Sequence, residues 1–251
     1  MKIDLRRALA EWSVLFLVIA LLSIGTYHRN SFWGEETRLW RDCVKKSPQK
    51  ERTHHNLGYA LFLLDHLDEA EGEFEEALRL NPRYAISMYN LGLTLYRKGD
   101  VDEAVKWYQK AIAQDSSFPE SFYNLGIAYY RKGLYKDAVE AYNKFLEAKP
   151  DYENARINLG LAYGKLKRWD EAIRSFQEEL RLHPGNPYAE EYLGFAYMEL
   201  KNYPRAVAAF RKALACTNSP DTGRIRMAIS SAEALQKARG GKGFDGSGEL
   251  L

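Results

Sequence analysis

The stretch YNLGLTLYRKGDVDEA, residues 89–104, combines an asparagine, a glycine, a basic pair and an acidic pair in the manner of a compact functional motif. The pattern returns 34 residues later as YNLGIAYYRKGLYKDA, residues 123–138. Three further copies are HNLGYALFLLDHLDEA at 55–70, INLGLAYGKLKRWDEA at 157–172 and EYLGFAYMELKNYPRA at 191–206. A pattern repeated at a fixed period of 34 residues indicates a stack of similar structural units.

Each copy is the start of a unit with two helical patterns. The first pattern surrounds the Leu-Gly pair, and the second carries small and aromatic residues such as Ala70, Phe74 and Ala77. Steps of four and three residues place these side chains on one helix face. We therefore expect antiparallel helix pairs that approach closely at glycine and alanine. The aromatic residues expected to fill the space between neighbouring units are Phe74, Tyr108, Tyr142, Phe176 and Phe210.

The Leu-Gly pair, the aromatic and alanine positions and a terminal proline such as Pro82 resemble the tetratricopeptide repeat. The resemblance covers residues 51–220 and implies an all-α solenoid, a right-handed superhelix of helical hairpins. Five repeats are expected at 51–84, 85–118, 119–152, 153–186 and 187–220. Residues 221–239 follow as an amphipathic capping helix, because an exposed solenoid end needs a polar cover, and residues 240–251 are expected to be a disordered tail.

The repeat period extends backwards into residues 31–50. Pro48, Trp40 and Cys43 each precede by 34 residues the proline, aromatic and alanine positions of the first repeat. Residues 34–46 are thus predicted to form the second helix of a sixth, incomplete unit.

An apolar segment precedes this partial repeat within residues 1–30. Trp12 to Tyr27 contain no charged residue, and Ala8 to Ala10 extend the segment to nearly the length that crosses a bilayer. We favour a single transmembrane helix. A cleaved secretory signal is the alternative, because basic residues stand at the start and the small residues Ser23 and Gly25 precede a possible cleavage point.

Residues 12–60 also resemble the region where the last membrane helix meets the repeats in polytopic transmembrane-and-tetratricopeptide glycosyltransferases. Those enzymes carry an acidic catalytic loop among earlier membrane helices, and this sequence has no such loop. The resemblance therefore assigns no catalytic residue to this sequence. The resemblance implies that the repeats lie on the extracytoplasmic side of the membrane, which is the periplasmic side in a bacterium.

Charge and composition do not indicate catalysis or nucleic-acid binding. Thirty-six basic and 34 acidic residues leave a formal net charge of +2, which is too balanced for a nucleic-acid partner. His54 and His55 are neighbours on a helix, so their rings point about 100° apart and do not converge on a metal. We predict no catalytic residue, no metal and no cofactor.

The remaining candidate site is the face that the first helices turn to the inside of the superhelix. An asparagine row flanked by apolar and aromatic residues suits an extended peptide, because each amide both donates and accepts hydrogen bonds. We expect these asparagines to face solvent in the free protein. The predicted groove residues are Asn56, Asn90, Asn124, Asn158, Tyr59, Tyr89, Leu93, Tyr96, Tyr123, Ile127, Tyr130 and Leu161.

Two function classes follow. The first is a membrane-anchored, non-catalytic scaffold that binds a protein or an extended peptide in its groove. The second is an accessory or separated repeat domain of a membrane glycosyltransferase system, which guides substrate to a catalytic partner. The sequence does not decide the oligomeric state.

Overall fold

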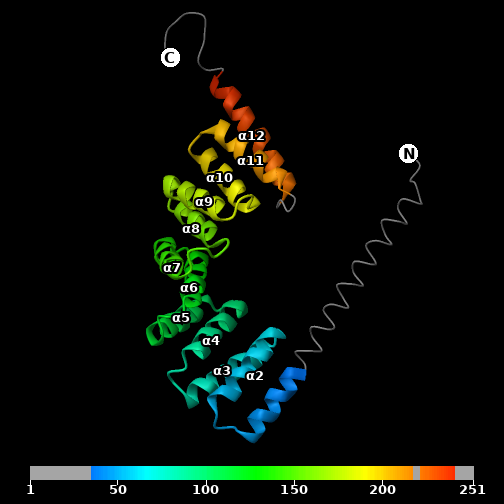
Figure 1. Cartoon of the computed structure of the whole chain (residues 1–251), viewed down its shortest axis with the longest axis vertical. Helices are drawn as coiled ribbons and strands as arrows, with labels where there is room; N and C mark the ends of the chain where they lie inside the picture. Colours follow the sequence, from blue (N-terminus) through cyan, green and yellow to red (C-terminus); the bar gives the residue numbers. More distant parts are fainter. Residues whose placement is uncertain (1–34, 217–220, 241–251) are drawn as a thin grey trace, which may run out of the picture. The chain divides into compact units, whose positions relative to one another are not determined.

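The computed structural model describes residues 35–216 and 221–240, and these residues form helices joined by short turns, without a β-strand (Figure 1). Residues 35–46 are helical. The helices that follow are α2 (Glu51–Leu63), α3 (Leu67–Leu80), α4 (Ala85–Lys98), α5 (Val101–Gln114), α6 (Glu120–Arg131), α7 (Tyr135–Ala148), α8 (Ala155–Lys165), α9 (Trp169–Leu182), α10 (Pro187–Glu199), α11 (Tyr203–Ala215) and α12 (Thr222–Gly240).

The predicted transmembrane segment and the C-terminal tail lie outside the described residues. Within the described ranges, no helix is both long enough and apolar enough to span a bilayer.

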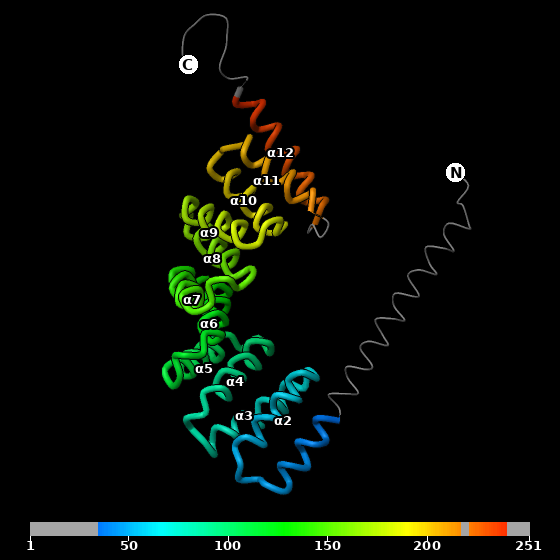
Figure 2. The backbone as a smooth tube through the Cα atoms, viewed as in Figure 1, coloured from blue at the N-terminus to red at the C-terminus, as the bar shows by residue number. Residues whose placement is uncertain are grey.

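The chain divides into two compact units, Met1–Gln114 (unit 1) and Asp115–Leu251 (unit 2). Unit 1 contains the hairpins α2–α3 and α4–α5, and unit 2 contains α6–α7, α8–α9 and α10–α11 (Figure 2). Within each unit, the second helix of one hairpin also packs against the first helix of the next. Helix α12 packs against α11.

A residue with positive φ ends the first helix of every repeat. In chain order these residues are Asp65, Gly99, Gly133, Lys167 and Lys201. The left-handed conformation lets the following N–H group reach a carbonyl oxygen in the last helical turn, as Asp100 N reaches Leu95 O at 2.9 Å. The same sharp turn therefore starts every second helix.

The repeated glycines allow an aromatic ring to lie against the first helix of the same repeat. A Cβ added to Gly92 would stand 2.7 Å from Tyr108 Cε1, and one added to Gly126 would stand 2.7 Å from Tyr142 Cδ1. The expectation that the five rings fill the space between neighbouring units is therefore right only in part. Phe176 does stack on Tyr192 of the next repeat, with 6.0 Å between ring centroids.

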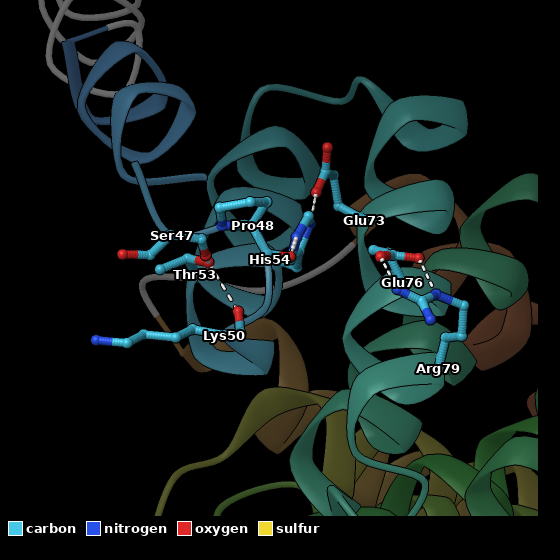
Figure 3. A network of polar contacts seen from close by, with 8 residues as sticks. All are labelled: Ser47, Pro48, Lys50, Thr53, His54, Glu73, Glu76 and Arg79. Atoms are coloured by element: carbon cyan, nitrogen blue, oxygen red, sulfur yellow. Dashed lines mark hydrogen bonds and ion pairs between the residues drawn. The ribbon is translucent and has the colours of Figure 1, made fainter. Parts of the chain in front are cut away.

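The turn before α2 is tied to the first repeat by a polar network (Figure 3). The buried His54 ring contacts Pro48 O at 3.1 Å and Glu73 Oε2 of α3 at 2.7 Å. Thr53 Oγ1 donates to Lys50 O at 2.7 Å. In the helical residues 35–46, Arg41 pairs with Glu69 at 2.6 Å. These contacts hold residues 35–50 against the first hairpin.

The basic pair of the quoted motif also has a structural role. Lys98 lies 2.6 Å from both Asp68 and Glu71 of the preceding repeat, and Arg97 donates to Phe62 O at 3.1 Å. Arg97 also pairs with Asp65 at 2.7 Å. The two cations therefore join α4 to the first hairpin, although exposed ion pairs of this kind contribute at most about 1 kcal/mol each.

Candidate functional site

The predicted groove residues occupy the first helices of both units. In unit 1, Tyr59 on α2 is exposed and Asn90 on α4 is buried, while the rest are half-buried: Asn56, Tyr89, Leu93 and Tyr96. In unit 2 the predicted residues are all half-buried, namely Tyr123, Asn124, Ile127 and Tyr130 on α6 and Asn158 and Leu161 on α8.

The asparagine side chains make contacts within the repeats. Asn124 Nδ2 donates to Glu120 O of its own helix at 3.1 Å, and Asn158 Nδ2 donates to Tyr123 Oη at 2.9 Å, which joins α8 to α6. Asn90 is only 6% exposed, so the expectation that it faces solvent is wrong. Two of these amides are thus used within the scaffold and a third is buried in it. The amide row contributes to the scaffold.

A pocket of about 300 Å³ opens in unit 2 beside the first helices α6, α8 and α10, which we call the first-helix face, and residues of α9 and α12 also line it. We call it the α8–α10 pocket. Aromatic and aliphatic side chains form its walls: Tyr130, Leu161, Trp169, Tyr192 and Phe195. Of these, Tyr130 and Leu161 belong to the predicted groove.

Gly164 lines the pocket and is the exception at its position in the repeats. The residues one repeat apart at this position are Phe62, Tyr96, Tyr130, Gly164 and Met198, so the fourth repeat alone lacks a large side chain. The ring of Trp169 lies behind this position, and a Cβ added to Gly164 would stand 3.0 Å from its Cζ3 atom. The Trp169 ring therefore packs directly against Gly164, and both residues line the pocket.

Charged side chains from three helices edge the pocket: Lys165, Glu199 and Arg224. Arg224 comes from α12 and lies over the Phe195 ring, 5.6 Å from its centroid. It also pairs with Glu191 of α10, whose carboxylate is fully buried. Burial raises the pKa of Glu191, and the Arg224 guanidinium partly opposes this increase by favouring the ionised carboxylate.

Sequence reasoning did not identify Gly164, Trp169 or Arg224 as part of a site. The signal for Gly164 is visible in the sequence as a break in a row of large residues. Arg224 lies outside the repeated segment, so no periodicity indicates it.

The two adjacent histidines have separate structural partners. His55 Nδ1 lies 2.8 Å from Ser87 Oγ, while His54 contacts Glu73 and Pro48 as described above. Among residues 35–216 and 221–240, no group of three His, Cys, Asp or Glu side chains is arranged to hold a metal ion.

Family models match most of the repeated segment. Models described as tetratricopeptide repeat match residues 51–84, 73–106, 119–152 and 157–222, and one described as TPR repeat matches residues 94–133. Together the models span 51–152 and 157–222, so this part of the chain consists of tetratricopeptide repeats. Among curated proteins, none matches the sequence of this chain.

Solved structures with the same fold include YrrB, described as a TPR protein with an unusual peptide-binding site, at a TM-score of 0.68 and 22% identity over 78% of this chain and 97% of YrrB. MamA from Desulfovibrio magneticus RS-1 has a TM-score of 0.64 and 22% identity over 68% of this chain and 97% of MamA. TTC0263, a thermophilic TPR protein from Thermus thermophilus, has a TM-score of 0.51 and 26% identity over 73% of this chain and 99% of its own length. These likenesses show that the described fold is a tetratricopeptide solenoid.

Proposed function

We propose that this protein is a non-catalytic scaffold that binds an extended segment of a partner protein on the first-helix face of unit 2. The partner places an apolar side chain in the α8–α10 pocket.

The composition of the α8–α10 pocket carries this proposal. Its walls are mostly aromatic, while three charged groups stand at its edge, which is the usual combination of an apolar hollow with a few orienting polar groups. Arg224 is already paired with the buried Glu191, and Lys165 at the same edge is balanced by the carboxylate of Glu199. We therefore expect the apolar anchor, rather than a net charge, to supply most of the affinity.

YrrB, which shares the fold, is described as having a peptide-binding site, and this supports a peptide as the ligand here. Asn90, Asn124 and Asn158 contribute little to peptide affinity in this proposal, because the amides of Asn124 and Asn158 are used in the scaffold and Asn90 is buried.

We further propose that Ala8 to Tyr27 form an uncleaved transmembrane anchor and that the repeats lie on the extracytoplasmic side. The apolar segment and the repeat periodicity that reaches back to Trp40 support retention of the segment. Alkaline extraction of membranes followed by N-terminal sequencing tests the anchor. A soluble product that starts near Thr26 would exclude it.

The alternative function, an accessory of a membrane glycosyltransferase system, depends on the resemblance of residues 12–60. It makes one distinct prediction, since the bound partner would then be a polytopic catalytic protein. Mass spectrometry of the captured partner separates the two functions.

Site-specific photocrosslinking tests the binding surface. A photoreactive phenylalanine analogue placed at Phe195 should crosslink to a partner in intact membranes. The same analogue at the exposed Glu140 of α7, a helix that contributes nothing to the pocket, is the control. Equal crosslinking from both positions, or from neither, would contradict the proposal.

A further inference from the structure

A second pocket lies in unit 2 between helices α9, α10 and α11. Its volume is about 540 Å³, within the range of small-ligand sites. We call it the α9–α11 pocket. It shares no lining residue with the α8–α10 pocket, so it is a separate site.

A buried carboxylate lines this pocket. Glu190 of α10 is 8% exposed, and its Oε2 atom has no hydrogen-bond partner in the described part of the chain. Its Oε1 atom lies 3.6 Å from Lys212 Nζ, but the Lys212 side chain is 71% exposed and free to swing into solvent. A buried carboxylate oxygen without a donor is costly, so this position favours a ligand that brings a hydrogen-bond donor.

The walls around Glu190 suit a flexible aliphatic chain. Leu180 of α9, Leu193 of α10 and Ala208 and Ala209 of α11 line the pocket. The Tyr197 ring forms a further wall, and Arg205, 5.8 Å from its centroid, is a second cation that lines the pocket besides Lys212. The stem of a lysine side chain is apolar and its end is a charged donor, which matches apolar walls that lead to a carboxylate.

We propose that the α9–α11 pocket binds the side chain of a lysine from a partner protein, with Glu190 as its counter-ion. The ligand ammonium donates to Glu190 Oε2, while Lys212 remains beside Oε1 or moves into solvent. Binding at this site is independent of the peptide segment proposed for the α8–α10 pocket.

The test uses N-acetyl-lysine methylamide, whose only charge is its ammonium group, and the norleucine analogue, which has the same stem without the charge. Titration of the full-length protein followed by NMR should show weak binding of the lysine probe and no binding of the norleucine probe. Glu190→Gln should weaken binding about tenfold, because the ammonium loses its counter-ion and a charge-assisted hydrogen bond becomes a neutral one. Lys212→Met should strengthen binding, because a competing cation is removed.

Glu140→Gln is the matched control, since the exposed Glu140 lines neither pocket and its loss should leave the affinity unchanged. Lys212 is exposed, so Lys212→Met should fold normally, and its effect on binding tests the proposal even if Glu190→Gln fails to fold. The proposal is overturned if the wild type does not bind the lysine probe at millimolar concentration. The proposal is also overturned if Lys212→Met binds the lysine probe more weakly than the wild type, or if Glu140→Gln weakens binding and Glu190→Gln does not.

Discussion

His55 is a histidine kept neutral by the packing of the first two repeats. Its ring is 7% exposed, bonds to Ser87 and lies 5.1 Å from the Tyr84 ring and 5.7 Å from the Phe74 ring, measured between centroids. Burial lowers the pKa of His55 to about 4, because the charged form loses its hydration. The unfolded chain binds a proton more readily at this residue than the folded chain does.

This difference predicts a loss of stability in mild acid. Above pH 6.5 His55 is neutral in both states and contributes no pH dependence. As the pH falls from 6.5 to about 4, the unfolded state takes up the proton first, and the free energy of unfolding should decrease by up to about 3 kcal/mol. Urea unfolding of the wild type and His55→Asn at several pH values measures the difference between the two profiles.

The control for this experiment is His66→Asn, which replaces an exposed histidine of the same hairpin. It should keep the wild-type pH profile, whereas His55→Asn should have a flatter one. Parallel profiles for the wild type and His55→Asn would show that burial of His55 does not affect its protonation.

At the scale of the hairpin, the closest packing is between a glycine of the first helix and a ring of the second. In the α4–α5 hairpin the pair is Gly92 and Tyr108, and Tyr108 is fully buried. A buried ring has no room to withdraw from an added methyl group.

Gly92→Ala should therefore destabilise the protein by about 1–3 kcal/mol through overpacking, despite the higher helix propensity of alanine. Gly72→Ala in α3 is the matched control, because nothing lies within 4 Å of its added Cβ. That change should stabilise the protein by about 0.5–1 kcal/mol. Thermal melts of both variants measure the effect, and shifts of the same sign would contradict the packing account.

The hairpins could be predicted from the sequence because their packing recurs in every repeat. The glycine-to-ring contact and the turn after the first helix each appear five times, as does the alanine at the position of Ala70, so periodicity reveals them. The candidate site depends on features that do not recur. Gly164 is the one small residue at a repeat position that otherwise holds large side chains. Arg224 of the capping helix α12 forms an ion pair with Glu191 of the last repeat, and no other described repeat has this pair. The asparagine row does recur, but the hydrogen-bond partners of Asn124 and Asn158 depend on contacts of the folded chain and cannot be read from the sequence.

For the molecule as a whole, the described C-terminal end is covered by α12. Ile225 and Ala232 of this helix are fully buried, and Arg211 of α11 pairs with Glu233 at 2.9 Å. Because each repeat contacts only its neighbours, loss of this cover should weaken the last repeat first.

Ile225→Ala should thus destabilise the α10–α11 hairpin by about 2–5 kcal/mol through loss of buried apolar contact. Hydrogen exchange measured by mass spectrometry should show faster exchange in α10 and α11 and unchanged exchange in α2 to α5. Met227→Ala is the control, since Met227 is 67% exposed on the same helix. Uniformly faster exchange along the whole chain would contradict nearest-neighbour stabilisation.

The central claim is that a partner segment inserts an apolar side chain into the α8–α10 pocket. Gly164→Tyr tests it most directly, because tyrosine already occupies this position in the second and third repeats as Tyr96 and Tyr130. The new Cβ would stand 3.0 Å from Trp169 Cζ3, so the indole ring must shift, and the tyrosine ring should then fill the pocket while the hairpin keeps its fold. Glu140→Tyr on α7 adds the same side chain away from the pocket and serves as the control.

The decisive measurement is a calorimetric titration of the segment crosslinked from Phe195, made as a synthetic peptide, against the wild type and both variants. The Gly164→Tyr variant should bind the peptide at least about tenfold more weakly, because the peptide can no longer bury its apolar side chain in the pocket. The Glu140→Tyr variant should bind the peptide as the wild type does. Melting temperatures of all three proteins verify the fold. Wild-type affinity in a folded Gly164→Tyr variant would contradict the claim and show that the partner does not use this pocket.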